Sequence, residues 1–419
     1  MALEAIFKIC FRMTLRARLK ISRPACLPAA LSLLLVTTAF RLRTTKPKKP
    51  SFAYSEPAWL ANYRSLHAHS VRQLLAGKHA DSRLLVYECQ GGCGGLGDRL
   101  SGIVSAFYLA IITGRTFFIN YTAPFSLTQT LVPNRISWDV ESLVLPVDSL
   151  VHLHLVDKRY DVVCDQVFDA HTKNVGVIKL TINTYAVGRE LWSEDSRNNF
   201  CDGAMWRLSE RYIKISPAET FGIAFSSLFR FSSKVISRAM EMESDMGLHM
   251  HGEKLSYTAI HARVGGNQAT SDTVAGWQDP VRHATSDAQA FISCAENRAC
   301  KHSRENCEPI VVVSDSEIFK SVCSKLRPDI RYYNQTNIMH IDRSKNVNET
   351  LLAQGNLDTY AELYILAHAK CIVGSQSGFS AIAGSILHHA RAESRCFSYF
   401  EDCGSSEFDF WVTHGVRAE

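Results

Sequence analysis

The chain has 419 residues, of which 46% are hydrophobic and 21% charged, a composition typical of a globular protein and not of a repeat or largely disordered one. Much of its net charge of +5 comes from the first fifty residues, so the remainder is near neutral or acidic and we expect no nucleic-acid partner. This length exceeds what one hydrophobic core usually supports, which predicts two domains with appendages.

An uncharged apolar stretch, Ala25 to Phe40, has basic residues on both sides. It is shorter than the roughly 20 residues of a typical membrane span, so a cleaved signal peptide and a buried helix are alternatives to an anchor. We favour a retained anchor, because the preceding basic residues would hold the amino terminus in the cytosol. The predicted order is a cytosolic tail (1–24), a transmembrane signal-anchor (25–40) and a stem (41–80), with the rest of the chain in a lumen.

The cysteines are consistent with an oxidising, lumenal compartment. Of the 13 in the chain, two precede residue 41, which leaves 11; because that number is odd, at least one thiol is free or pairs between chains. Zinc is the alternative, but the chain has no Cys-x-x-Cys spacing and no paired histidines beside the cysteines. Three clusters could supply disulfides: Cys89/Cys93, Cys294/Cys300/Cys307 and Cys396/Cys403. Glycosylation sequons, which fit a lumenal glycoprotein, begin at Asn120, Asn334 and Asn348.

A glycine-rich turn lies between a predicted strand at 84–90 and a predicted helix at 98–113, and a second strand follows at 116–120. Such a turn exposes backbone amides at a helix amino terminus, which favours an anionic ligand. The run Gly92 to Gly97 matches the dinucleotide fingerprint G-x-G-x-x-G, which raises the hypothesis of a dehydrogenase. However, the second strand ends in Asn120, where a ribose-binding carboxylate is expected. Alternatively, the glycines only permit a tight turn and close packing.

The patterns between residues 126 and 245 are weaker. We expect strands at 151–155 and 175–182 and one helix at 221–240. His152 and His154 share one strand face, but no carboxylate or cysteine at a matching offset supports a metal site there.

A second α/β domain is predicted to begin near residue 246. Its first strand ends in Arg263 before two glycines, and an arginine at the carboxyl end of a strand is suited to clamping an anion. The alternative is an ion pair between Arg263 and a neighbouring carboxylate. An apolar strand at 309–314 is followed by Asp315 and Glu317, an acid pair that could hold a divalent ion, although the Asp-x-Asp motif is absent from the chain.

A helix at 357–370, with Asp358 as its expected cap, leads to a short strand at 371–374 and a loop rich in serine. The small-residue helix that follows could hold phosphate on its first backbone amides. Alternatively, Ser377 or Ser380 caps this helix without a ligand. Together with the glycine turn and Arg263, the pattern predicts a cleft between two α/β domains (81–245 and 246–419) that grips a pyrophosphate.

Three motifs, in family order, resemble those of GDP-fucose-dependent fucosyltransferases, notably the plant xyloglucan and α1,2 enzymes. Gly94-Gly-Leu-Gly-Asp-Arg99 resembles their Gly-Leu-Gly-Asn-Arg motif, and His261-Ala-Arg263-Val-Gly265 resembles their His-x-Arg-x-Gly motif. Ser375-Gln-Ser-Gly-Phe-Ser380 is similar to a motif shared with α1,6- and protein O-fucosyltransferases. The resemblance covers roughly residues 84 to 390, and only its motifs are specific.

The resemblance implies two Rossmann-like domains facing each other across a cleft, of the GT-B kind, and a Golgi or ER membrane protein with the acceptor on the first domain. It also implies inverting transfer of fucose from GDP-fucose to a glycan or glycoprotein hydroxyl, with no metal and no other cofactor. By carry-over, the catalytic residues are Arg263, on the donor diphosphate, and Asp98, which is either the general base or only a helix-stabilising residue. The implied donor-binding residues are His261, Arg263, Gly265, Asp358, Ser377, Gly378, Phe379 and Ser380, and those of the cleft loop are Gly94, Gly95, Gly97 and Arg99.

Several alternatives stay open. Asp272 and Asp279 are further candidates for the general base. A glycosyltransferase for another sugar nucleotide would keep the anion clamp, whereas a lumenal glycan-binding protein would keep the fold without needing a positioned arginine. The motifs predict nothing about the oligomeric state.

Overall fold

The computed structural model describes residues 56–78, 82–139, 149–158, 160–184, 217–250, 253–265, 281–300, 307–334, 348–390, 396–401 and 403. All of them belong to one compact unit that begins at Tyr54. The predicted cytosolic tail and signal-anchor lie outside the described residues. Among the residues that the structure does describe, no helix is both long enough and apolar enough to cross a membrane.

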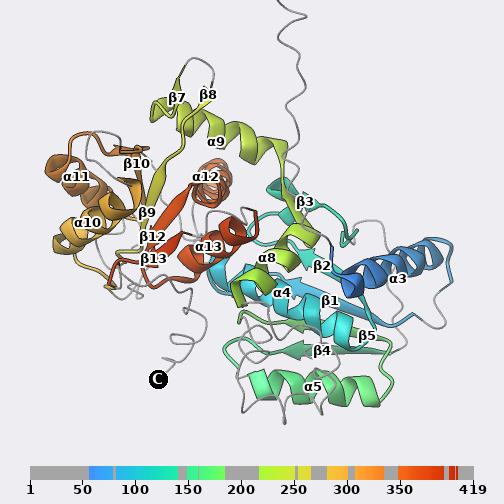
Figure 1. The fold of residues 1–419 in the computed structure, drawn as a ribbon. Helices are drawn as coiled ribbons and strands as arrows, with labels where there is room; N and C mark the ends of the chain where they lie inside the picture. Colours follow the sequence, from blue (N-terminus) through green and yellow to red (C-terminus); the bar gives the residue numbers. More distant parts are fainter. Residues whose placement is uncertain are drawn as a thin grey trace, which may run out of the picture. The chain divides into compact units, whose positions relative to one another are not determined.

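The first sheet has four parallel strands in the order β2-β1-β5-β4. Helix α4 packs along one of its faces (Figure 1), where the Phe107 ring of the helix lies 5.5 Å from the Phe117 ring of β2. The elements of this part are α3 (Ala58–Leu75), β1 (Leu84–Cys89), α4 (Leu96–Ile112), β2 (Thr116–Tyr121), β4 (Leu150–His154), α5 (Tyr160–Thr172) and β5 (Val177–Thr181).

Part of the predicted stem (41–80) is helical, because it contains α3. Helix α3 buries Leu60, Tyr63 and Leu74. The Tyr63 hydroxyl donates to the Arg115 carbonyl at 2.9 Å, which ties α3 to the start of β2. Residues 58–75 thus belong to the folded part of the chain.

The second sheet has five parallel strands in the order β11-β10-β9-β12-β13. The apolar strand predicted at 309–314 is β10 of this sheet, and a strand that is apolar throughout is typical of a buried parallel sheet. Its elements are β9 (Thr258–Ala262), η5 (Thr285–Asp287), α10 (Ala288–Ala299), β10 (Ile310–Ser314), α11 (Glu317–Leu326), β11 (Arg331–Tyr332), α12 (Glu349–Ala367), β12 (Cys371–Gly374), α13 (Gly378–Ala390) and β13 (Phe397–Tyr399).

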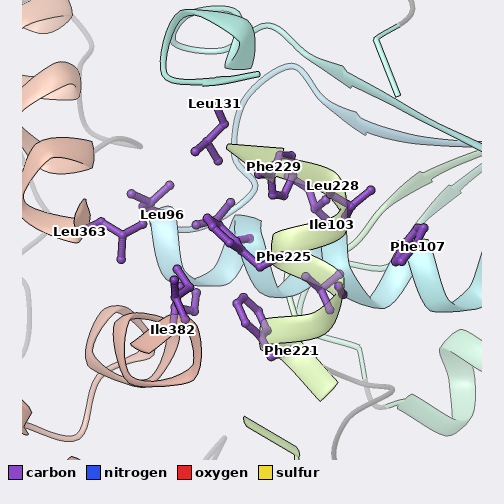
Figure 2. Close-up of a cluster of buried hydrophobic side chains, with 14 of the residues drawn as sticks. Leu96, Ile103, Phe107, Leu131, Phe221, Phe225, Leu228, Phe229, Leu363 and Ile382 are labelled. Carbon is purple, nitrogen blue, oxygen red and sulfur yellow. The ribbon is translucent and has the colours of Figure 1, made fainter. Parts of the chain in front are cut away.

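A phenylalanine-rich helix, α8 (Pro217–Leu228), packs against both α4 and α13. Figure 2 shows Phe221 and Phe225 of this helix between Ile103 of α4 and Ile382 of α13. One buried hydrophobic cluster therefore runs from the helices of the first sheet to those of the second. The other elements that join the two parts are η1 (Leu127–Gln129), β3 (Leu131–Pro133), β6 (Phe229–Phe231), α9 (Ser233–Asp245), β7 (His249–Met250) and β8 (Glu253–Lys254).

Two helix predictions are wrong. The helix expected at 221–240 is interrupted by β6, which pairs antiparallel with β3, and α9 then begins afresh with the Ser232 side chain accepting from the Val235 N–H. Asp358 is not a helix cap, because α12 begins nine residues earlier, at Glu349, with Asn348 as its cap.

The cysteines of the described part form disulfides, in agreement with the sequence. The pairs are Cys89–Cys93, Cys294–Cys403, Cys300–Cys307 and Cys371–Cys396. Among the described cysteines, Cys323 is buried and free, which fits the expectation of at least one unpaired thiol. The described residues contain no group of three or more His, Cys, Asp or Glu side chains that could hold a metal ion. Asn120, the first residue of a predicted sequon, donates its side-chain amide to Glu88 at 3.1 Å.

Candidate functional site

A cavity of about 860 Å³, part of it open to solvent, lies where the glycine turn of the first sheet meets the strand ends of the second. Its lining comes from the first turn of α4, the residues that follow β9 and β10, the middle of α12 and the first turn of α13. Of the residues predicted from the motifs, eight line this cavity: Gly95, Gly97, Asp98, His261, Arg263, Ser377, Gly378 and Phe379.

The glycine turn is held by side chains from the first turn of α4. Gly94 has φ +83°, a conformation that only glycine adopts without strain. The Asp98 carboxylate accepts the Gly95 N–H at 3.0 Å, which stabilises the first turn of α4. Behind the turn, the buried Arg99 donates from Nε to the Gly94 carbonyl at 2.8 Å and from Nη1 to the Tyr121 hydroxyl at 2.8 Å. Arg99 and Gly94 therefore support the turn without lining the cavity.

The amino termini of α4 and α13 meet at this cavity. A Cβ added to Gly97 would lie 2.8 Å from the Gly378 carbonyl carbon and 3.0 Å from the Phe379 nitrogen, so the two backbones are in direct contact. The Ser377 hydroxyl accepts the Ser380 N–H at 3.1 Å, so the helix capping that the sequence left as an alternative is present. No described residue accepts the N–H of Gly378 or Phe379. Two positive helix ends thus face one space, as in an anion site.

Arg263 follows β9 directly and lines the cavity. Its Nη1 lies 2.9 Å from the Asp315 carboxylate, so the ion pair that the sequence left as an alternative is present. The same carboxylate accepts the N–H groups of Val264 at 2.7 Å and Gly265 at 3.1 Å. Gly265, with φ +69°, shapes this turn and does not line the cavity. Asp315 therefore orients Arg263. Glu317, the other member of the acid pair considered for a divalent ion, instead pairs with Lys320 at 2.8 Å.

His261 is buried beneath the helix start. Its Nδ1 lies 2.5 Å from the Ser380 hydroxyl, and its ring packs 5.0 Å from that of Phe379. Burial, and after it the charge of Arg263, lowers the pKa of His261 to about 3, so the ring is neutral near pH 7. His261 and Ser380 thus fix the first turn of α13, and Ser380 itself does not line the cavity.

Asp358, a predicted donor contact, also lies outside the lining. Its carboxylate accepts from Arg238 Nε at 2.6 Å and from Gln354 Nε2 at 2.7 Å, so it joins α12 to α9. The next turn of α12 instead presents Glu362 and Thr359 to the cavity. Asp272 and Asp279 lie outside the described residues.

Two charged lining residues were missed by the sequence reasoning. Glu362 is half-buried and makes no hydrogen bond with the described residues, and burial raises its pKa to about 8, against the opposing effect of Lys320. Arg282 is exposed at the cavity. The spacing of Glu362 from Asp358, one helical turn, is the only local signal that could have identified it.

No protein-family model and no curated protein matches the chain. Its fold is similar to that of a mutant of Arabidopsis thaliana FUT1, a fucosyltransferase, solved in complex with GDP: the TM-score is 0.52 at 16% identity, over 84% of this chain and 81% of that one. The α1,6-fucosyltransferase NodZ soaked with GDP-fucose gives a TM-score of 0.42 at 17% identity, over 73% and 93% of the two chains. NodZ from Bradyrhizobium gives 0.41 at 15% identity, over 72% and 92%. The likeness to FUT1 confirms the predicted α/β fold with parallel sheets.

Proposed function

We propose that this protein is a fucosyltransferase that transfers fucose from GDP-fucose to a hydroxyl group of a glycan or glycoprotein. One observation carries the proposal: the amino termini of α4 and α13 and the Arg263 guanidinium all face one cavity. The fold is shared with FUT1, whose structure was solved with GDP bound, and this supports the choice of nucleotide.

The geometry suits a diphosphate leaving group. Backbone N–H groups at a helix start and a guanidinium are both strong partners for phosphate oxygens. During transfer, the bond between the fucose anomeric carbon and the β-phosphate oxygen breaks, and its electron pair stays on GDP. Because Arg263 is already held by Asp315, it can stabilise this charge with little reorganisation, which is the condition for effective electrostatic catalysis.

We infer two Rossmann-like halves of the GT-B kind, a single-pass type II protein of the Golgi or ER membrane, and transfer that needs no metal, since the helix ends and arginines supply positive charge. The acceptor hydroxyl attacks from the opposite face and inverts the anomeric centre. Asp98 is the candidate base among the described residues, and its position in the cavity lining supports this role beside its part in holding α4.

Donor turnover tests the proposal. The purified full-length protein is incubated with GDP-fucose and a panel of glycan acceptors, and GDP release and fucosylated product are both measured. Arg263→Ala should lower turnover by about 100-fold or more, the usual cost of removing one preorganised charge-stabilising donor.

Arg230→Ala is the matched control, because Arg230 is an exposed arginine on β6 outside the cavity. Its turnover should equal that of the wild type. Turnover in Arg263→Ala that also equals the wild type, with both variants folded, would remove Arg263 from the mechanism. Product from another sugar nucleotide and none from GDP-fucose would assign the protein to a different transferase class.

A further inference from the structure

Arg282 is fixed beside the end of β9 although it lies about twenty residues further along the chain. Its N–H donates to the Val264 carbonyl at 2.9 Å, and the His283 N–H reaches the same oxygen at 3.4 Å. Val264 follows Arg263 directly, so the two arginine backbones are close neighbours across this contact. Both side chains line the cavity.

The two arginines differ in how their charge is balanced. Arg263 is paired with Asp315 at 2.9 Å, and its side chain is 21% exposed. Arg282 is exposed, and its guanidinium makes no hydrogen bond or ion pair with any described residue. Of the two carboxyl groups that remain in the lining, Asp98 is engaged by the Gly95 N–H, and Glu362 is mostly protonated near pH 7 because its pKa is raised to about 8. Arg282 therefore brings a guanidinium that no described residue engages directly.

A nucleoside diphosphate needs more than one positive partner. Bound as a sugar nucleotide, it carries about two negative charges, and a further charge develops on the β-phosphate as the bond to the sugar breaks. One guanidinium that already shares its charge with a carboxylate cannot balance this. A second, unpaired guanidinium at the same cavity can do so, and it does not require a metal ion.

We propose that Arg282 is a second catalytic arginine, which binds the β-phosphate and stabilises the charge on the departing nucleoside diphosphate. This inference rests on the proposed function, in that the ligand is a sugar nucleotide. The assignment to the β-phosphate follows from exposure: the acceptor reaches the reacting bond from solvent, and Arg282 is the more exposed of the two arginines. Arg263 and the two helix starts then hold the rest of the diphosphate.

The test compares nucleotides that differ by one phosphate. GDP and GMP are titrated calorimetrically into full-length wild type, Arg282→Gln, Arg282→Lys and the control Arg230→Gln, and GDP-fucose turnover is measured on each. Arg282→Gln should weaken GDP binding by about tenfold or more while leaving GMP binding within about twofold of the wild type. Its turnover at saturating donor should fall as well, and Arg282→Lys, which keeps the charge, should lie between Arg282→Gln and the wild type.

Four outcomes would overturn the inference. Unchanged GDP affinity and turnover in Arg282→Gln would show that Arg282 does not contact the diphosphate, while wild-type GDP binding would leave the proposed function standing. Equal losses for GDP and GMP would exclude the β-phosphate as its partner. Failure of the wild type to bind GDP at all would overturn both proposals together. Because Arg282 is exposed, its variants should melt at the same temperature as Arg230→Gln, and a lower melting temperature would assign Arg282 a structural role instead.

Discussion

At the scale of single residues, burial sets which groups in the cavity carry charge. The pKa of His261 is lowered to about 3 and that of Glu362 is raised to about 8, so both side chains are uncharged near pH 7. A neutral Glu362 carboxyl group can donate a hydrogen bond to a ligand and adds no negative charge beside a diphosphate. The neutral forms of these two side chains thus leave the arginines and helix starts of the lining free to bind an anionic ligand.

Glu362→Gln should change how stability depends on pH. The folded-state pKa of Glu362 lies above its ordinary value of 4.5, so bound protons favour the folded state. Its contribution is fully present below about pH 4.5 and is lost as the pH rises through about 8. Urea unfolding of the variant and the wild type at several pH values between about 5 and 9 should show the variant gaining relative stability as the pH rises.

The control is Asp245→Asn, which neutralises an exposed carboxyl group at the end of α9. A stability difference between Glu362→Gln and the wild type that is independent of pH, or that follows the same course as the control, would contradict the assignment of a raised pKa to Glu362.

At the scale of elements, the site depends on two helix starts in backbone contact. Gly97 of α4 and Gly378 of α13 allow this approach because neither carries a side chain. The Arg99 guanidinium holds one turn from behind, and the His261 ring holds the other through Ser380. Each helix start is thus held by a buried side chain through contacts within the protein, whether or not a ligand is bound.

Gly97→Ala should weaken GDP binding. The new Cβ would lie 2.8 Å from the Gly378 carbonyl carbon, so the two helix starts must move apart. Alanine stabilises a helix relative to glycine by about 1 kcal/mol, so the substitution should not destabilise α4 itself. A measured loss of GDP affinity or of thermal stability would therefore come from the contact with Gly378. Calorimetric GDP titration and thermal melting of the variant measure the effect.

Gly176→Ala is the comparison, because a Cβ there would meet its nearest neighbour, the Ser149 carbonyl, at 3.4 Å and lies away from the cavity. If Gly97→Ala binds GDP as tightly as Gly176→Ala does, the contact between α4 and α13 is not part of the binding site.

The elements show what local sequence patterns can and cannot predict. The apolar strands, the glycine turn and the position of Arg263 could be predicted, because each is a local run that ends at a change of composition. The break between α8 and α9 could not, because Phe229 and Phe231 continue the helical pattern and β6 forms only through its pairing with β3. Arg282 and Glu362 were missed for the same reason, since contacts distant in sequence bring them to the cavity.

At the scale of the whole molecule, one hydrophobic cluster and a set of disulfides hold the described chain together. The cluster extends through α8 from the helices of one sheet to those of the other. The Cys294–Cys403 disulfide closes a sequence separation of 109 residues within the second part. Disulfides of this number are typical of proteins that fold in an oxidising compartment, which supports the proposed lumenal location. The order of the strands in both sheets, by contrast, could not be predicted from the sequence, because an apolar run does not specify which other strands it pairs with.

Nucleotide preference is the property that distinguishes a GDP-fucose-dependent transferase from its alternatives. The full-length protein is titrated with GDP, UDP and NAD, each with and without EDTA. A GDP-fucose donor, as proposed, requires GDP to bind more tightly than UDP and NAD not to bind. We expect EDTA to leave the affinity for GDP unchanged, because helix ends and arginines supply the positive charge for a diphosphate. Binding of UDP that requires a divalent metal, binding of NAD, or the absence of any nucleotide binding would contradict the assignment of this protein as a GDP-fucose-dependent transferase.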